Sequence, residues 1–189
     1  MKKTEKSLLE PGMELILTKW IGLSGTVQAV KNRESLLLTR FPGAMIRQAG
    51  EFASLIDTTK ELEEARKAGA AAIFPLGSQG VFSGLWRMAD AAGVGLMVDV
   101  RRIPIRQETV EICEFFDMNP YYLQSYGALL VGTHDGYGAA DRLNRAGIPA
   151  EVIGRTTDGN DRILYNQGNC RYLDRPQKDE IYKLGDCIK

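Results

Sequence analysis

The feature that most restricts the fold of this chain is the alternation of short apolar segments with longer amphipathic ones. Apolar runs that predict strands occupy residues 70–74, 94–100, 127–132 and 150–154. Segments with helical spacing lie between them, at residues 81–92, 108–116 and 135–146. Helices that separate strands in this way are typical of an α/β sheet with some parallel pairs.

The two ends of the chain extend this pattern. Further segments are predicted as a strand over residues 13–18 and as helices over 27–38 and 58–67. Residues 150–154 and 162–165 flank an Asp158-Gly159 turn and are predicted to pair as a β-hairpin, which makes the sheet mixed. We therefore predict one layered α/β domain over residues 11–189, preceded by an N-terminal extension of residues 1–10.

The charge balance limits the classes of partner. The chain has 24 basic and 24 acidic residues, so it offers no positive field for nucleic acid or for an anionic membrane surface. No apolar stretch approaches the length of a membrane span, and the N-terminus lacks the apolar run of a signal peptide. Cys113, Cys170 and Cys187 are widely spaced, which indicates reduced thiols. We predict a cytoplasmic protein without nucleic-acid or membrane partners.

The most suggestive local motif is the turn Pro75-Leu76-Gly77-Ser78-Gln79-Gly80, between a predicted strand and a predicted helix. Backbone amides at such a junction can hold an anion, and glycine allows a phosphate to approach. The turn is neither GxGxxG nor a Walker loop. The alternative is a tight structural turn in which Ser78 caps the helix.

We name Gly77, Ser78, Gln79 and Gly80 as candidate ligand-binding residues, with Lys19 as a counter-charge. The expected ligand is a small anion or polar molecule that binds weakly. A bulky β-branched residue in place of Gly80 is then expected to abolish ligand binding while the fold survives.

Other polar residues give weaker signals. His134 is the only histidine and lies in Thr133-His134-Asp135-Gly136, where Thr133 or Asp135 is predicted to cap a helix. The acidic residues are spread over different elements and predict neither a metal site nor a catalytic pair, so we assign no catalytic residue.

The order of the segments carries more information than any single motif. Three stretches resemble the C-terminal domain of the AIR synthase superfamily, and of its hydrogenase maturation factor in particular: GMELILTKWIGLSG (12–25), LWRMADAAGVGLMVDVRRIPIRQETVEICEFFDMNPYYLQSYGALLV (85–131) and RAGIPAEVIGRTTDG (145–159). RPQKDEIYKL (175–184) is similar to tails of AIR-synthase-related proteins. The resemblance implies the α/β fold of that C-terminal domain.

The resemblance also implies an activity for the family. Its enzymes use ATP to phosphorylate an amide- or thioamide-type oxygen, and their N-terminal domain supplies the Mg²⁺ ligands, the phosphate contacts and much of the dimer interface. That domain is not present in this sequence, so we expect no cofactor on the isolated chain.

The family pattern is altered at two places in this chain. The maturation factor has a turn similar to D-P-T-R-G-G where this chain has Pro75 to Gly80, and a glutamate where this chain has Tyr126. Its C-terminal cysteine is matched only by the position of Cys187, which we attribute to chance. Because phosphoryl transfer needs preorganised charged groups, these losses favour a non-catalytic binding or regulatory module. The alternative is half of a split enzyme, completed by a separate ATP-binding protein.

Assembly is the last expectation from sequence. The surface that the family's N-terminal domain covers would be exposed here, which predicts a homodimer or larger assembly. We expect its interface to include the apolar side chains of Ile16, Leu17, Trp20 and Ile21.

Overall fold

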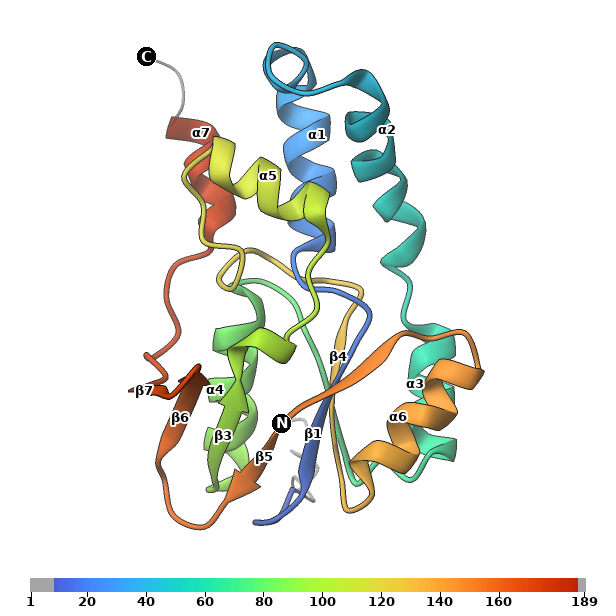
Figure 1. The fold of residues 1–189 in the computed structure, drawn as a ribbon, viewed down its shortest axis with the longest axis vertical. Coiled ribbons are helices and arrows are strands. Elements are labelled where there is room, and N and C mark those ends of the chain that lie inside the picture. The colour runs from blue at the N-terminus through green and yellow to red at the C-terminus, as the bar shows by residue number, and fades with distance from the viewer. Residues whose placement is uncertain (1–8, 187–189) are drawn as a thin grey trace, which may run out of the picture.

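A single sheet of seven strands organises the protein, for which a computed structural model describes residues 9–186 (Figure 1). The strands lie in the order β2-β4-β1-β5-β3-β6-β7. Their bounds are β1 Glu14–Thr18, β2 Ala72–Pro75, β3 Gly95–Asp99, β4 Leu129–Thr133, β5 Ala150–Thr157, β6 Arg162–Asn166 and β7 Asn169–Tyr172. Neighbouring strands run antiparallel except β3 and β6, which are parallel. The predicted mixed α/β sheet is confirmed.

Seven helices surround the sheet in the described part of the chain: α1 Leu23–Leu37, α2 Gly43–Glu51, α3 Thr59–Lys67, α4 Gly80–Ala92, α5 Gln107–Phe115, α6 Gly136–Arg145 and α7 Lys183–Asp186. Short 3-10 helices are η1 Phe52–Leu55, η2 Val100–Arg102 and η3 Glu180–Tyr182. In Figure 1, α4 lies behind β3, α3 and α6 lie beside β4 and β5, and α1, α2, α5 and α7 form a separate group above the sheet. None of the described helices is both long and apolar enough to cross a membrane.

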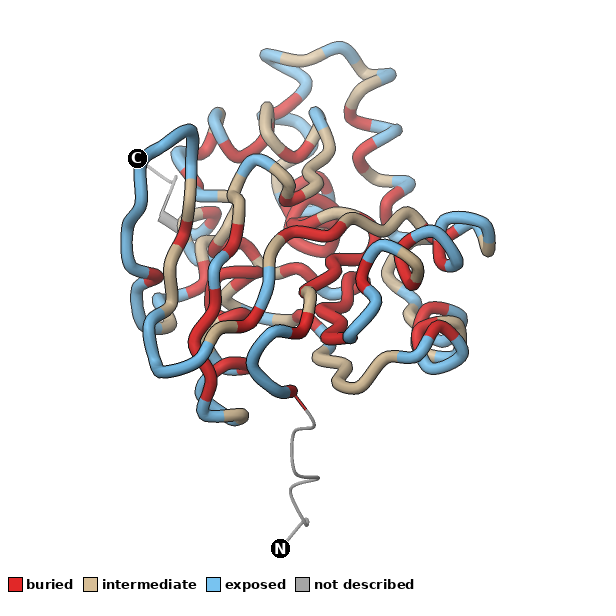
Figure 2. The backbone as a smooth tube through the Cα atoms, turned by 60° about the horizontal axis from the view of Figure 1, so that its bottom comes forward, coloured by how far each residue is buried: buried red, intermediate tan, exposed pale blue. Residues whose placement is uncertain are grey.

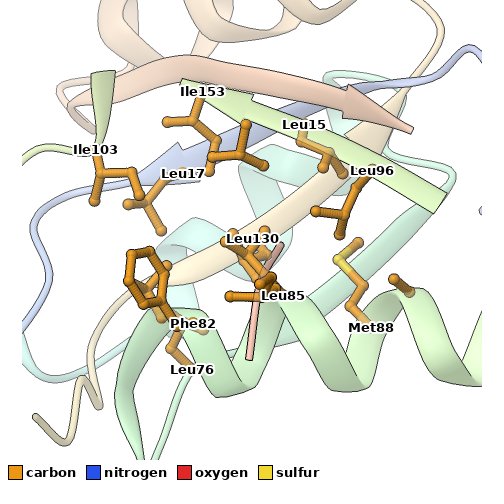
Figure 3. Packing of buried hydrophobic residues seen from close by; sticks show 14 of the residues in the cluster. Leu15, Leu17, Leu76, Phe82, Leu85, Met88, Leu96, Ile103, Leu130 and Ile153 are labelled. Carbon is orange, nitrogen blue, oxygen red and sulfur yellow. The ribbon is translucent and has the colours of Figure 1, made fainter. Parts of the chain in front are cut away.

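Strand alternation divides the apolar side chains between the two faces of the sheet. Leu15 and Leu17 of β1 pack with Leu85 of α4 in the largest apolar cluster (Figure 3). Ile16, between them, packs in a second cluster with side chains of α3 and α6. Successive residues of a strand point to opposite faces, so β1 contributes to both layers. A third cluster joins α1, α2, α5 and α7. Figure 2 shows these buried positions concentrated inside the molecule, with exposed backbone at its rim.

The predicted terminal hairpin is wrong. Although Asp158-Gly159 does link β5 to β6, these strands are not neighbours, because β3 lies between them. β3 is an apolar strand and needs a partner on each side, and β5 and β6 provide both. The hairpin that does form joins β6 and β7 through Gln167 and Gly168, both with the positive φ that a two-residue loop requires. β7 and α2 are absent from the sequence prediction.

The expected dimer contacts are also wrong in part. Ile16, Leu17 and Ile21 are completely buried in the chain's own core. They cannot contribute a surface to a partner unless the domain opens. Trp20 is half-buried, and the Arg106 guanidinium lies 4.9 Å from the centre of its ring. Leu9 is also buried in the core, although it falls inside the predicted N-terminal extension.

The two described cysteines are expected to differ in reactivity. Burial, with a smaller contribution from Glu180, raises the pKa of Cys113 to about 12, whereas Cys170 is exposed on β7. At pH 8 only about one Cys113 thiol in ten thousand is then ionised, and the thiolate is the reactive form. Iodoacetamide should alkylate Cys170 in the native protein and Cys113 only after unfolding, which peptide mass spectrometry can follow. Equal native labelling would contradict this burial. Cys187 lies outside the described residues.

Candidate functional site

The strand-to-helix turn at the start of α4 is formed by backbone that favours glycine. Gln79 and Gly80 both have left-handed φ angles, 68° and 69°. A Cβ atom on Gly80 would lie 2.4 Å from the carbonyl oxygen of Tyr121, so glycine is required there by both conformation and space. This geometry argues against our expectation that the fold survives a bulky residue at this position.

A carboxylate from the C-terminal segment accepts a hydrogen bond from one amide of this turn, that of Gln79. Asp179 is 6% exposed, and its Oδ2 accepts a hydrogen bond of 2.8 Å from the Gln79 backbone N–H. Its Oδ1 accepts from the backbone N–H groups of Gln124, at 3.2 Å, and Ile181, at 3.0 Å. A negative charge at a helix N-terminus is stabilised by the free amides and by the helix dipole. The chain therefore supplies its own anion at the place where an external one was predicted.

The other turn residues are arranged differently. Ser78 is exposed, and the N-cap residue of α4 is Gln79, which makes no side-chain cap. The predicted Ser78 cap is therefore wrong. The carbonyl of Gly77 accepts the Ser125 N–H at 2.9 Å. A Cβ on Gly77 would lie 3.2 Å from the ring of Tyr126, so this tyrosine lies directly against the turn.

The side chain of Lys19 makes its contacts away from the turn. It is 4% exposed, and its ammonium donates to the carbonyls of Leu55, at 2.6 Å, and Asp57, at 2.8 Å. The third contact is an ion pair with Oε1 of Glu61 at 2.8 Å. These contacts account for the three N–H donors of the ammonium. In this arrangement Lys19 fixes the link between η1 and α3 and has no donor left for an anion at the turn.

The loop of residues 119–127 joins the turn to a second helix N-terminus. The Gly22 N–H donates to Oγ of Ser125 at 2.9 Å, and the Tyr126 N–H donates to Oγ of Ser24 at 3.0 Å. The starts of α1 and α4 thus meet at one loop. Sequence reasoning did not identify Asp179 or Ser125 as part of this site, because both act through contacts more than 45 residues apart in the chain.

The histidine loop and the acidic residues form no further candidate site in the described chain. Asp135 caps α6 by accepting the Gly138 N–H at 2.9 Å, so the predicted capping role of the His134 loop is confirmed. Within the described residues, no group of three or more histidine, cysteine, aspartate or glutamate side chains is arranged to hold a metal ion.

Asp179→Ala is expected to lower the free energy of unfolding by about 2–3 kcal/mol, because it leaves three partly buried N–H donors without their charged acceptor. Urea denaturation followed by circular dichroism measures this change. Asp174→Ala is the matched control from the same segment, since its carboxylate is 61% exposed and pairs with Arg171 only at 3.5 Å. The control should stay within about 0.5 kcal/mol of the parent. Equal effects of the two substitutions would show that Asp179 is not an internal cap.

The architecture defines a class: a layered α/β domain with a mixed sheet, in which the starts of two helices meet at a single loop. Residues 10–166 match the family described as AIR synthase related protein, C-terminal domain. Because this match covers most of the 189 residues, the chain belongs to that family. The resemblance inferred from sequence is confirmed.

Individual relatives point to the same group. Carbamoyl dehydratase HypE of Rhodobacter capsulatus is 32% identical over 112 residues, which are 56% of this chain and 33% of the relative. The E. coli HypE crystal structure matches with a TM-score of 0.75 at 19% identity, over 95% of this chain and 54% of that one. A structure of HypE in complex with ATP matches with a TM-score of 0.67 at 14% identity, over 95% of this chain and 55% of that one. These structures share the fold, and this chain spans about half of their length.

Proposed function

We propose that this chain is a non-catalytic binding or regulatory module of the AIR-synthase-related C-terminal type. The observation that carries this proposal is the Asp179 carboxylate on the Gln79 amide, at the N-terminus of α4. A phosphate placed there would meet a buried negative charge where it needs free amide donors.

The residues of the turn also support a non-catalytic role. The segment Pro75 to Gly80 has no charged side chain, and Tyr126 lies against Gly77. The resemblance aligns these two places with charged positions of the maturation factor. A turn without positively charged side chains gives little stabilisation to a phosphoryl-transfer transition state. A weakly bound polar ligand at Gly77, Ser78, Gln79 and Gly80 stays part of the proposal, and such a ligand must displace Asp179 from the Gln79 amide.

ATP binding tests the proposal. Calorimetric titration of the chain with ATP·Mg should give no saturable heat in the low micromolar range, and phosphate release should equal the buffer blank. Micromolar binding, or ATP turnover that a point mutation in this chain abolishes, would overturn the non-catalytic role.

A second candidate is one half of a split ATP-dependent enzyme that activates an amide or thioamide. It is favoured by the length relation, because HypE, which is solved with ATP, is about twice as long as the matched region. Co-expression with the product of a neighbouring gene that encodes an AIR-synthase N-terminal domain decides between the two. A stable complex with ATPase activity supports the split enzyme, and the absence of both supports the binding module.

We further propose that the chain is cytoplasmic and self-associates as a homodimer or larger assembly. The support is a set of large apolar or aromatic side chains that stay exposed in the described chain, including Met97, Tyr137 and Tyr172. Exposed apolar side chains mark interaction surfaces when they are contiguous. Light scattering at high micromolar concentration should give at least twice the monomer mass of 20.9 kDa, and a monomer mass would contradict the assembly.

A further inference from the structure

A polar pocket of about 470 Å³ lies between the C-terminal half of α4, the start of β6 and the end of β7. Its lining residues are Trp86, Asp90, Asn160, Arg162, Tyr172, Leu173 and Arg175. Volumes of a few hundred Å³ are typical of sites for small molecules. Gly80 to Val81 at the start of α4 do not line it, so the pocket is separate from the turn described above.

Arg162 is a largely buried cation of this pocket, and its guanidinium makes a single hydrogen bond within the described residues. Its side chain is 15% exposed, and its guanidinium lies 4.5 Å from the centre of the Trp86 ring. Nη2 reaches Oδ1 of Asp90 at 3.2 Å, but Nε is buried and has no hydrogen-bond partner within the described chain. Guanidinium carries five donors in a planar fork, which suits two-point recognition of a carboxylate or phosphate. Stacking on the Trp86 ring fixes the plane of the Arg162 guanidinium in the absence of a ligand.

The balance of charge in the pocket favours an anion. Arg175 lines the same space, and among residues 9–186 its side chain has no ion pair. Asp90 is the only acidic residue among those that line the pocket, whereas two arginines line it. The cavity at Trp20 differs, because each of its cations already has an acidic partner: Asp99 for Arg101, Glu151 for Arg102 and Glu61 for Lys19. Of these two cavities, the one at Trp86 has an arginine without an ion pair among the described residues.

We propose that this pocket binds a small aromatic carboxylate. The carboxylate would lie against Arg162 and Arg175, while the exposed ring of Tyr172 offers flat apolar surface for the ring of the ligand. The inference goes beyond the proposed function, since it assigns a ligand class to a site away from the Gln79 amide. Failure of ATP to bind at the turn leaves it intact.

The two tryptophans of the chain provide the test and its internal control. Each lies under an arginine, Trp86 under Arg162 and Trp20 under Arg106, so a general effect of benzoate on such pairs would move both indole N–H signals. In a ¹H–¹⁵N spectrum of the full chain titrated with benzoate, the Trp86 indole signal should move saturably, with a dissociation constant on the order of 1 mM. The Trp20 signal should stay in place. Benzyl alcohol, which has the ring without the charge, should leave both unchanged.

Two variants connect the signal to the arginines. Arg162→Met keeps the apolar stem of the side chain and should abolish the saturable shift of the Trp86 signal. Arg175→Gln, at an exposed position, should weaken the binding of benzoate about tenfold, because it removes a charge-assisted contact. Arg106→Met is the matched control and should leave benzoate binding unchanged. The proposal is overturned if the Trp86 signal does not respond to benzoate, if benzyl alcohol produces the same shift, or if Arg175→Gln binds like the parent protein.

Discussion

Lys19→Met is expected to lower the free energy of unfolding by about 3–5 kcal/mol, because it leaves a buried carboxylate without its cation. The side chains of Lys19 and Glu61 are only 5% and 10% exposed, so solvent replaces little of the lost interaction. The carbonyls of Leu55 and Asp57 lose their donor in the same substitution. Urea denaturation monitored by circular dichroism gives the difference.

Lys67→Met is the matched control for this experiment. Lys67 also pairs with glutamates, Glu63 at 2.8 Å and Glu64 at 3.0 Å, but its side chain is 59% exposed. Solvent screens such pairs, so the control should unfold at the same urea concentration as the parent. If Lys19→Met and Lys67→Met have equally small effects on stability, then the contacts of Lys19 do not stabilise the fold as we expect.

Gly80→Val is expected to have an effect of similar size, at about 4 kcal/mol or more, because two penalties act at one position. The left-handed φ of 69° is unfavourable for any residue with a Cβ. The Cβ would also overlap the backbone of Tyr121, at 2.4 Å from its carbonyl oxygen, and a backbone atom cannot move aside as a side chain can. Thermal unfolding should show a large loss or an insoluble product.

Gly93→Ala separates these two penalties. Gly93 ends the same helix with nearly the same φ, 67°, but nothing lies within 4 Å of its hypothetical Cβ. Its substitution should therefore cost only about 1–2 kcal/mol, the price of the left-handed conformation alone. A loss at Gly80 no greater than that at Gly93 would mean that the loop at Tyr121 gives way easily.

Local patterns predicted most of the elements and the fold class, because the periodicity of the apolar residues is set within each segment. The segments 81–92 and 135–146 correspond closely to α4 and α6, and Asp135 caps α6 as expected. Pairing between strands was less accessible to sequence. The Asp158-Gly159 turn has the local chemistry of a hairpin, but whether two strands pair depends on the insertion of β3, which no local pattern shows.

The candidate site shows the same limit. Glycine at position 80 was identified from sequence, and its left-handed φ gives the physical reason for it. The role of Asp179 could not be predicted, because it depends on the C-terminal segment crossing the turn 100 residues earlier in the chain. Lys19 was placed at the end of its strand correctly, but its partner Glu61 is set by the packing of α3. Sequence alone could not tell a free cation from a paired one.

The backbone amide of Gln79 reports most directly on whether Asp179 closes the turn. In a ¹H–¹⁵N spectrum of the wild-type chain, this signal should stay in place up to about 1 mM ATP·Mg, a concentration that would saturate any micromolar site. Asp179→Ala should move the signal strongly even without nucleotide, because the amide loses its 2.8 Å hydrogen bond to the carboxylate. A wild-type Gln79 signal that shifts and saturates at micromolar ATP·Mg would contradict the internal cap and the non-catalytic role that rests on it.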